Sequence, residues 1–278
     1  MRLVWQLLAV AAIAFVGGQG VNAAQGNWWL TLGIGIATAV LSVFVYAWIV
    51  RLTERREVTE VSRQGAASGI GLGTLLGIGL FTMVIVNIAF LEGYRVDGLG
   101  SVTGAVGLFG FMAAAAVTEE VLYRGVLFRI IEQWSGTWTA LTLTSIVFGL
   151  SHLLNPNASL WGAIAIAIEA GSMLGAAYVA TRKLWVPIGL HFGWNLAASA
   201  VFSTEVSGNG TPQGLLDATT SGPVMLTGGD FGPEGSLYSM VFCVLTAIVF
   251  LWLARRRGNL VPMRRRADRA TAAATLPR

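Results

Sequence analysis

The side chains of this chain that could do chemistry are few, and they lie in stretches apolar enough to cross a membrane. At the centre of a bilayer each ionisable group costs about 2.5–3.5 kcal/mol, so it needs a partner or a function. The group comprises Glu119, Glu120, Arg124, His152, Glu169, His191 and Asn195. It contains the only two histidines of the sequence. Carboxylates, imidazoles and an amide can activate water for hydrolysis or relay protons.

Helical spacing separates the two adjacent acids. Glu120 and Arg124 are four residues apart with the acid first, which favours an ion pair on one helix face. Glu119 lies about 140° around the helix from Arg124, because each residue turns the helix by about 100°. We therefore expect Glu120 and Arg124 to form a structural pair, which leaves Glu119 available for chemistry.

Two further pairs of residues have the same helical spacing. His191 and Asn195 are four residues apart, so the imidazole and the amide project from one face. Phe148 and His152 are also four apart, which places an aromatic ring beside the second imidazole. We expect these side chains to meet Glu119 in the core of a helical bundle, where facing helices build sites.

The depths of these residues agree only in part. Counted at about 1.5 Å per residue from the turn at 135–137, Glu119 and His152 lie at similar heights. His191 fits less well, because it is only a few residues into a helix that begins near 185. That helix must start deep in the membrane or be strongly tilted.

The composition indicates a membrane protein. Hydrophobic residues make up 55% of the 278 residues and charged residues 12%, against about 25% charged in ordinary globular domains. Mean hydropathy is +0.68. The single cysteine, Cys243, excludes an intramolecular disulfide framework, a thiolate zinc cluster and a CxxC redox pair. The net charge of +4 does not indicate nucleic-acid binding, because the basic residues flank apolar runs.

Eight apolar runs are long enough to cross a bilayer as helices, which takes about 20 residues each. They cover approximately 2–22, 29–50, 70–92, 102–133, 138–154, 158–181, 185–203 and 236–254. We predict an all-α polytopic membrane bundle over 1–254, followed by a basic cytoplasmic tail over 255–278. Glycines recur every fourth residue at Gly69, Gly73 and Gly77, a spacing that lets two helices approach closely in lipid.

The basic residues predict the orientation of the bundle. Arg and Lys follow the second, sixth and eighth runs, so these loops share one side when eight helices are threaded in order. The opposite side carries Arg95 and the loop 204–235, which has no Lys or Arg. The positive-inside rule then places both termini in the cytoplasm, for a multi-pass protein of the plasma membrane if the source is prokaryotic. The first run also resembles a cleavable signal peptide, and we favour a retained helix.

Three motifs in the middle of the chain resemble those of the CPBP family of intramembrane proteases, which includes CAAX proteases and bacteriocin-processing (Abi) proteins. Residues 119–124 match its EExxxR motif, 148–152 its FxxxH motif and 191–195 its HxxxN motif. The motifs occur in the family's order and spacing, within a core at about 102–203. Each is weak alone, but together they contain both histidines.

The resemblance implies an endopeptidase that cleaves peptide bonds within or beside the membrane. The best-studied relatives remove the last three residues of prenylated CAAX proteins. Carried over to this sequence, Glu119 is the general base that activates water. The residues that position this water and stabilise the oxyanion are His152, His191 and Asn195. The supporting residues are Glu120, Arg124 and Phe148.

Two chemical versions of such a site stay open. In the version that we favour, Glu119 takes a proton directly from water and no cofactor takes part. In the other, Glu119, His152 and His191 bind zinc and leave one position for water, as catalytic zinc sites do. The familiar HExxH zinc motif is absent from the sequence. Zinc would also require a separate base, for which Glu120 would have to leave Arg124.

Two other kinds of protein compete with the protease. Buried acids and histidines also serve proton-coupled transporters, although such carriers usually contain two similar halves, which this sequence lacks. A non-catalytic immunity or scaffold membrane protein is the third alternative. The partners that we expect are membrane lipid and a membrane-associated or lipidated peptide substrate, and no nucleic acid.

Overall fold

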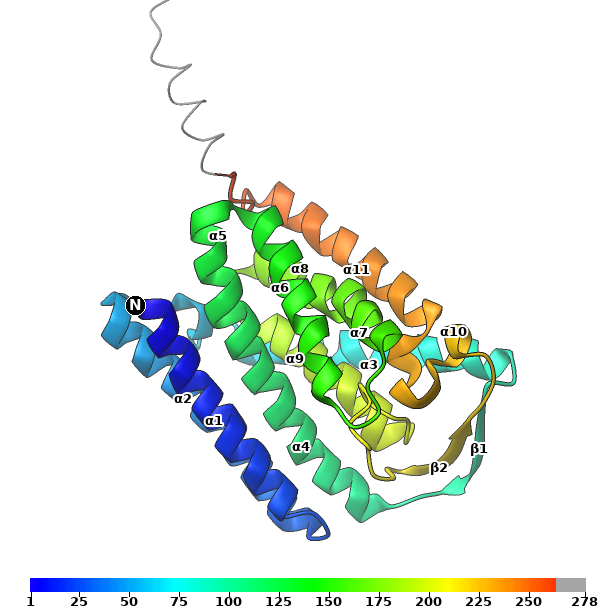
Figure 1. Cartoon of the computed structure of the whole chain (residues 1–278). Coiled ribbons are helices and arrows are strands. Elements are labelled where there is room, and N and C mark those ends of the chain that lie inside the picture. The colour runs from blue at the N-terminus through cyan, green and yellow to red at the C-terminus, as the bar shows by residue number, and fades with distance from the viewer. Residues whose placement is uncertain (264–278) are drawn as a thin grey trace, which may run out of the picture.

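The structure is a computed structural model that describes residues 1–263, and it arranges them as a bundle of long helices (Figure 1). Seven helical runs within these residues are long and apolar enough to cross a membrane: Arg2–Ala23 (α1), Trp28–Glu54 (α2), Ala66–Phe90 (α3), Val102–Ser135, Thr137–Leu154, Leu160–Thr181 and Leu237–Arg256 (α11). An eighth, α9 (Trp185–Leu196) with its extension to Val201, is slightly shorter. The predicted all-α membrane bundle of about eight helices is therefore confirmed.

Three of these runs contain a π-helical segment. The segments are η2 (Val121–Phe128) between α4 (Val102–Glu120) and α5 (Arg129–Ser135), η4 (Ala167–Gly171) between α7 (Leu160–Ile166) and α8 (Ser172–Thr181), and η5 (Ala197–Val201) after α9. The run before Leu154 consists of α6 (Thr137–Ser151) and the 3-10 turn η3 (His152–Leu154). π-Helical turns are frequent at functional sites. Here η2 begins directly after Glu120 and η5 begins two residues after Asn195.

Short polar side chains and glycines mark where the helices begin and turn. Asn27 accepts a hydrogen bond from Leu30 N at the start of α2, and Ser101 does the same for Gly104 N at the start of α4. Such N-caps satisfy amide groups that have no partner within the helix. Gly136 separates α5 from α6 with φ of 84°, a conformation that favours glycine.

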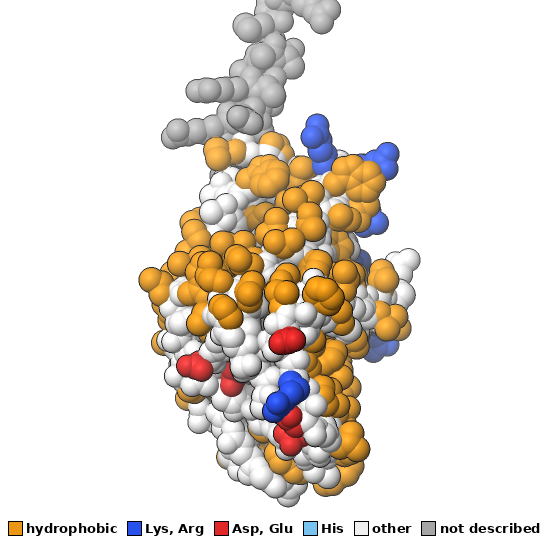
Figure 2. Space-filling model, turned by 90° about the vertical axis from the view of Figure 1, so that its right-hand side faces the viewer, with side chains coloured by type: hydrophobic (Ala, Val, Ile, Leu, Met, Phe, Trp, Pro, Cys, Tyr) orange, Lys and Arg blue, Asp and Glu red, His pale blue; other side chains and the backbone are white. Residues whose placement is uncertain are grey.

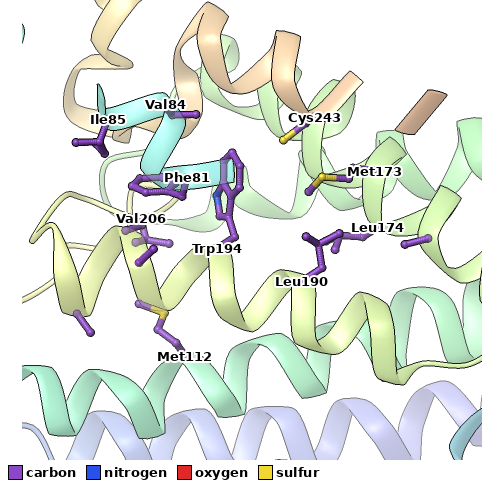
Figure 3. Packing of buried hydrophobic residues seen from close by; sticks show 14 of the residues in the cluster. Phe81, Val84, Ile85, Met112, Met173, Leu174, Leu190, Trp194, Val206 and Cys243 are labelled. Atoms are coloured by element: carbon purple, nitrogen blue, oxygen red, sulfur yellow. The ribbon is translucent and has the colours of Figure 1, made fainter. Parts of the chain in front are cut away.

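Helices α3 and α9 contact each other backbone to backbone. A Cβ atom at Gly77 would lie 2.3 Å from Leu190 O, and one at Gly193 would lie 2.2 Å from Thr74 O. The predicted glycine ladder therefore packs against α9, which carries glycines of its own. Figure 3 shows the Trp194 side chain reaching from α9 toward Phe81 of α3, and their ring centroids are 5.1 Å apart.

A small antiparallel sheet lies at one end of the bundle (Figure 1). It pairs β1 (Tyr94–Leu99) with β2 (Leu216–Thr220), so part of the predicted loop 204–235 is a strand. Tyr94 Oη donates to Phe202 O at 2.8 Å, which ties β1 to the end of η5. An isolated pair of strands is only marginally stable in water, so this contact with the helices stabilises the sheet.

The basic loops gather at the opposite end. Arg2 Nη2 donates to Gln133 Oε1 at 2.5 Å, and Thr137 N donates to Val261 O at 3.0 Å, so both ends of the described chain meet the α5–α6 turn. Arg129 forms an ion pair with Glu54 at 2.8 Å in the same region. The two ends therefore share one side, as predicted; the compartment that this side faces stays a prediction.

The surface of the bundle is mainly apolar. Figure 2 shows hydrophobic side chains gathered over the upper part of one face, with a few charged groups in the lower part. Many large exposed side chains, such as Phe44 and Trp48 on α2, have more than half of their surface uncovered. A surface of this kind is suited to lipid, so the chain is a multi-pass membrane protein. The predicted tail lies mostly outside the described residues, but its start as far as Val261 is bonded to the bundle.

Candidate active site

Helices α4 and α9 meet at the carboxylate of Glu120. Its Oε1 accepts one hydrogen bond from Arg124 Nη1 at 2.7 Å and another from His191 Nδ1 at 2.9 Å. Glu120 is fully buried and Arg124 is 1% exposed. The predicted ion pair is therefore present. It also holds the His191 ring, a contact between helices that spacing within one helix does not reveal.

Arg124 connects this pair to the rest of the site. Its Nη2 donates to the carbonyls of Ala170 and Gly171, at 3.1 and 3.2 Å, in the π-helical segment η4. Its Cζ lies 4.7 Å from the centroid of the Phe148 ring, a cation–π contact. The Phe148 ring in turn lies 4.8 Å from the His152 ring, as the spacing predicts. Arg124 thus joins three helical segments around the two imidazoles.

Glu119 approaches the other nitrogen of the same imidazole. Its Oε2 lies 3.9 Å from His191 Nε2, beyond direct hydrogen-bonding distance, and has no hydrogen-bond partner within residues 1–263. The side chain is 32% exposed, whereas that of Glu120 is fully buried. The two adjacent glutamates therefore differ in environment and face opposite nitrogens of one ring.

The hydrogen bonds of the two histidines define their proton positions. His191 Nδ1 faces Glu120 Oε1, which also accepts from Arg124, and His152 Nδ1 lies 2.7 Å from Phe148 O. Both oxygens can only accept, so each Nδ1 carries a hydrogen. Each Nε2 therefore accepts a hydrogen bond in the neutral ring and donates one only in the imidazolium form.

A small cavity lies beside these rings. About 10 Å³ of it is open to the centre of a water-sized sphere, which is close to the space that one water molecule needs. Its lining consists of Phe148, His152, Ile166, Ala170, Met173, Leu174, His191, Trp194, Asn195, Ser207, Glu234 and Cys243. The cavity thus brings together both histidines and the Asn195 amide. His191 is the residue that connects this cavity to the two glutamates of α4.

Sequence reasoning missed Glu234, which lies in the 3-10 turn η7 (Pro233–Gly235) before α11. Glu234 is 2% exposed, and its carboxyl group accepts hydrogen bonds from Trp194 and Ser207. Burial raises the pKa of Glu234, while these hydrogen bonds and the nearby His152 lower it. No spacing in the sequence relates position 234 to the motifs, so only the folded loop reveals this residue.

Glu169 differs from what its position suggests. A carboxyl group within a membrane helix predicts a hydrogen bond to a neighbouring helix, and Glu169 is indeed fully buried, in η4. Neither of its oxygens finds a hydrogen-bond partner within residues 1–263. Unlike the two histidines and Asn195, Glu169 does not line the cavity.

The donor set proposed for zinc does not form a metal centre in this arrangement. In the part of the chain that the structure describes, no three His, Cys, Asp or Glu side chains are grouped closely enough to hold a metal ion. Of the three zinc candidates, Glu119 and His191 approach each other to 3.9 Å, and the bond from His152 Nδ1 to Phe148 O still leaves His152 Nε2 as an acceptor. No step of the chemistry proposed below therefore uses a metal.

The depth of His191 is explained by the length of the helix that faces it. The run Val102–Ser135 has 34 residues and therefore measures about 51 Å, well beyond the roughly 30 Å of a bilayer core. It must be strongly tilted or project from the membrane, so residue counts along it overstate depth. His191 reaches Glu120 from a helix that begins at Trp185.

Comparison with known proteins agrees with this geometry. The family model described as "Type II CAAX prenyl endopeptidase Rce1-like" matches residues 101–197, which contain all three motifs and both histidines. We call residues 101–197, which are similar to this family, the Rce1-like segment. Within the Rce1-like segment lie Glu119, Glu120, Arg124, His152, His191 and Asn195.

A relative extends the similarity beyond the Rce1-like segment. The Bacillus subtilis (strain 168) protein named "Putative membrane peptidase YdiL" is 25% identical over 217 residues, which are 69% of this chain and 82% of that protein. No solved structure matches the chain. The resemblance predicted from the three motifs is thus confirmed, while the role of each residue stays a prediction.

Proposed function

We propose that this protein is an intramembrane endopeptidase that hydrolyses peptide bonds of membrane-associated substrates with water activated by Glu119. One observation carries the proposal. Two adjacent glutamates approach opposite nitrogens of His191, whose ring also lines a water-sized cavity with His152 and Asn195. The Rce1-like segment and the membrane peptidase named above support the reaction class.

Glu119 is the group suited to act as the base. Its Oε2 faces His191 Nε2 across 3.9 Å, a separation at which one water molecule can contact both atoms. Glu119 takes a proton from this water as the water oxygen bonds to the scissile carbonyl carbon, and the carbonyl oxygen becomes an oxyanion. When the C–N bond breaks, the same proton passes from Glu119 to the leaving amine, and the carboxylate is restored.

The oxyanion needs donors that are already in place. The Asn195 amide donates in any protonation state, so we assign it the principal role. His152 and His191 donate from Nε2 only as imidazolium, because each Nδ1 already binds an oxygen. Glu120 and Arg124 keep the His191 ring oriented and do not themselves contact the substrate.

The surroundings of the site suit a substrate that reaches it from the membrane. The cavity lining is mainly apolar, and the helices around it expose apolar side chains to lipid. We therefore propose a membrane-associated peptide as substrate, with lipidated CAAX-type C-termini as the first class to test. In this proposal the basic side of the bundle faces the cytoplasm.

A cleavage assay with the purified protein in lipid nanodiscs tests the proposal. Glu119→Gln is expected to lower kcat by about 10²- to 10⁴-fold, the usual contribution of a general base, while helical content and unfolding midpoint stay unchanged. Asp97→Asn is the matched control, because Asp97 is an acid of the exposed strand β1. Full activity of Glu119→Gln would refute the assignment of the base.

The same assay separates the metal-free reaction from its alternatives. Activity is expected to survive a strong chelator, whereas complete loss with recovery on added zinc would favour the metal version. If the wild-type protein cleaves no lipidated or transmembrane peptide, the endopeptidase proposal fails. Proton-coupled uptake into vesicles, or partner binding that survives Glu119→Gln, would then point to a transporter or a scaffold.

A further inference from the structure

Glu234 is a buried carboxylate of the cavity that the mechanism above does not use. It lies in η7, far along the chain from both histidines, yet it shares the cavity lining with them. Two oxygen atoms of this side chain accept three hydrogen bonds, all from donors that are themselves more than nine-tenths buried. Such a concentration of donors on one buried group indicates that its position is specified.

One side of Glu234 is bound to the helix that carries His191. Oε1 accepts a hydrogen bond from Trp194 Nε1 at 2.9 Å. Trp194 is three residues after His191 and directly before Asn195, on α9. Its indole also packs edge-on against Phe81, with ring centroids 5.1 Å apart. The indole is therefore fixed at both ends.

The other side of Glu234 is connected to the turn that follows His152. Oε2 accepts hydrogen bonds from Ser207 N at 2.6 Å and from Ser207 Oγ at 2.7 Å. Ser207 O in turn accepts from Asn155 Nδ2 at 2.6 Å, and Asn155 N donates to His152 O at 3.2 Å. A second bond, from Asn157 N to Gly208 O, holds the same two segments together.

We propose that Glu234 is a positioning residue that holds the two histidine-bearing segments at a fixed separation across the cavity. The path runs from Trp194 on α9, through Glu234, to Ser207 and Asn155 beside His152. This inference rests on the proposed peptidase function for its kinetic consequence, but the connection itself can be measured without any substrate.

The chemistry of the position requires a carboxylate. Trp194 Nε1, Ser207 N and Ser207 Oγ all donate, and a carboxylate presents two accepting oxygens to them. Glutamine presents one accepting oxygen and one NH₂ group. Whichever way the amide turns, its NH₂ group meets either the indole N–H or the Ser207 N–H, so one of the two connections is lost.

Kinetics of Glu234→Gln give the first test. Because a displacement of about 1 Å at a reacting group can cost about 100-fold, we expect kcat to fall by roughly 10- to 100-fold while KM stays within about twofold. Ser239→Ala is the matched control: its buried hydroxyl donates to Pro233 O in the same segment but contacts neither histidine segment. This control is expected to retain wild-type kcat.

A double-mutant cycle identifies the path. In a Trp194→Phe background the indole donor is already gone, so Glu234→Gln is expected to lower kcat by a smaller factor than in the wild-type background. If Glu234→Gln does not fold, Asn155→Ala breaks the same path at the His152 end and carries the test. Additive effects in the cycle, or equal losses in Ser239→Ala, would overturn the proposal.

Nuclear magnetic resonance supplies a readout that does not depend on cleavage. Only two histidines are present, so protein labelled with ¹⁵N-histidine and purified without a histidine tag gives signals from His152 and His191 alone. Glu234→Gln is expected to shift the His152 ring signals, and Ser239→Ala to leave both residues unchanged. Unchanged spectra in Glu234→Gln would refute the connection. If the wild-type protein is inactive but Glu234→Gln still shifts the His152 signals, only the proposed peptidase function is refuted.

Discussion

Replacing Arg124 by methionine is expected to destabilise the bundle by about 3–5 kcal/mol, because Glu120 would stay buried without its counter-ion. The two groups are 2.7 Å apart, and at an effective dielectric constant of about 20 Coulomb's law gives roughly 6 kcal/mol for such a pair. The His191 bond to Glu120 compensates for part of this loss, and so the expected value is lower.

The pair is tested by a cycle of Arg124→Met, Glu120→Gln and the double variant. The double variant leaves no unpaired charge, so its destabilisation is expected to be about 2–3 kcal/mol smaller than the sum of the single effects. Denaturant unfolding in mixed micelles, followed by circular dichroism, measures each value. Arg95→Met is the control, because the Arg95–Asp97 pair is exposed and worth less than about 1 kcal/mol.

Two results would refute this reasoning. Single substitutions that cost less than about 1 kcal/mol would mean that the Glu120–Arg124 pair behaves like a surface pair despite its burial. Strictly additive effects would mean that the two side chains act independently, contrary to their 2.7 Å contact.

The glycine contact between α3 and α9 and the buried tyrosine of β1 give two further tests. Gly77→Ala places a Cβ atom 2.3 Å from Leu190 O and is expected to lower the free energy of unfolding by about 1–3 kcal/mol. The control Gly79→Ala meets no atom within 4 Å, so it should be neutral or stabilising. Equal unfolding midpoints of the two variants would contradict the close packing. Burial raises the pKa of Tyr94 to about 12, so the unfolded chain releases this proton near pH 10 and the folded chain does not. The stability difference between wild type and Tyr94→Phe should therefore fall from about pH 10 to pH 12, and a difference independent of pH would show that Tyr94 titrates normally.

The sequence was sufficient for contacts within one helix. The four-residue spacings of Glu120 with Arg124 and of Phe148 with His152 produce the contacts that they predict, because the helical repeat alone places those side chains together. The membrane helices were predictable as well, since lipid requires long apolar runs with internally satisfied backbones. Their ends agree with the structure within a few residues, except for the start of α3 at Ala66 and the end of α2 at Glu54.

Contacts between helices were harder to predict from the sequence. The bond from His191 to Glu120 depends on the tilt of a 34-residue helix, which no local pattern encodes. Glu234 depends on the path of a loop rich in glycine, where neither helical nor strand periodicity operates. The strand pair Tyr94–Leu99 and Leu216–Thr220 was also missed, because its two strands are more than a hundred residues apart in the sequence.

The length of the π-helical segment η2 determines how far the helix turns about its axis between Glu120 and Arg129, two residues that each bind another helix. Before it, Glu120 faces His191 on α9; after it, Arg129 faces Glu54 on α2. Deleting a single residue between them would turn Arg129 by about 100° around the axis, even if every remaining side chain were kept. The length of η2 is therefore constrained independently of the side chains that it carries, because a one-residue change would cost one of these two contacts.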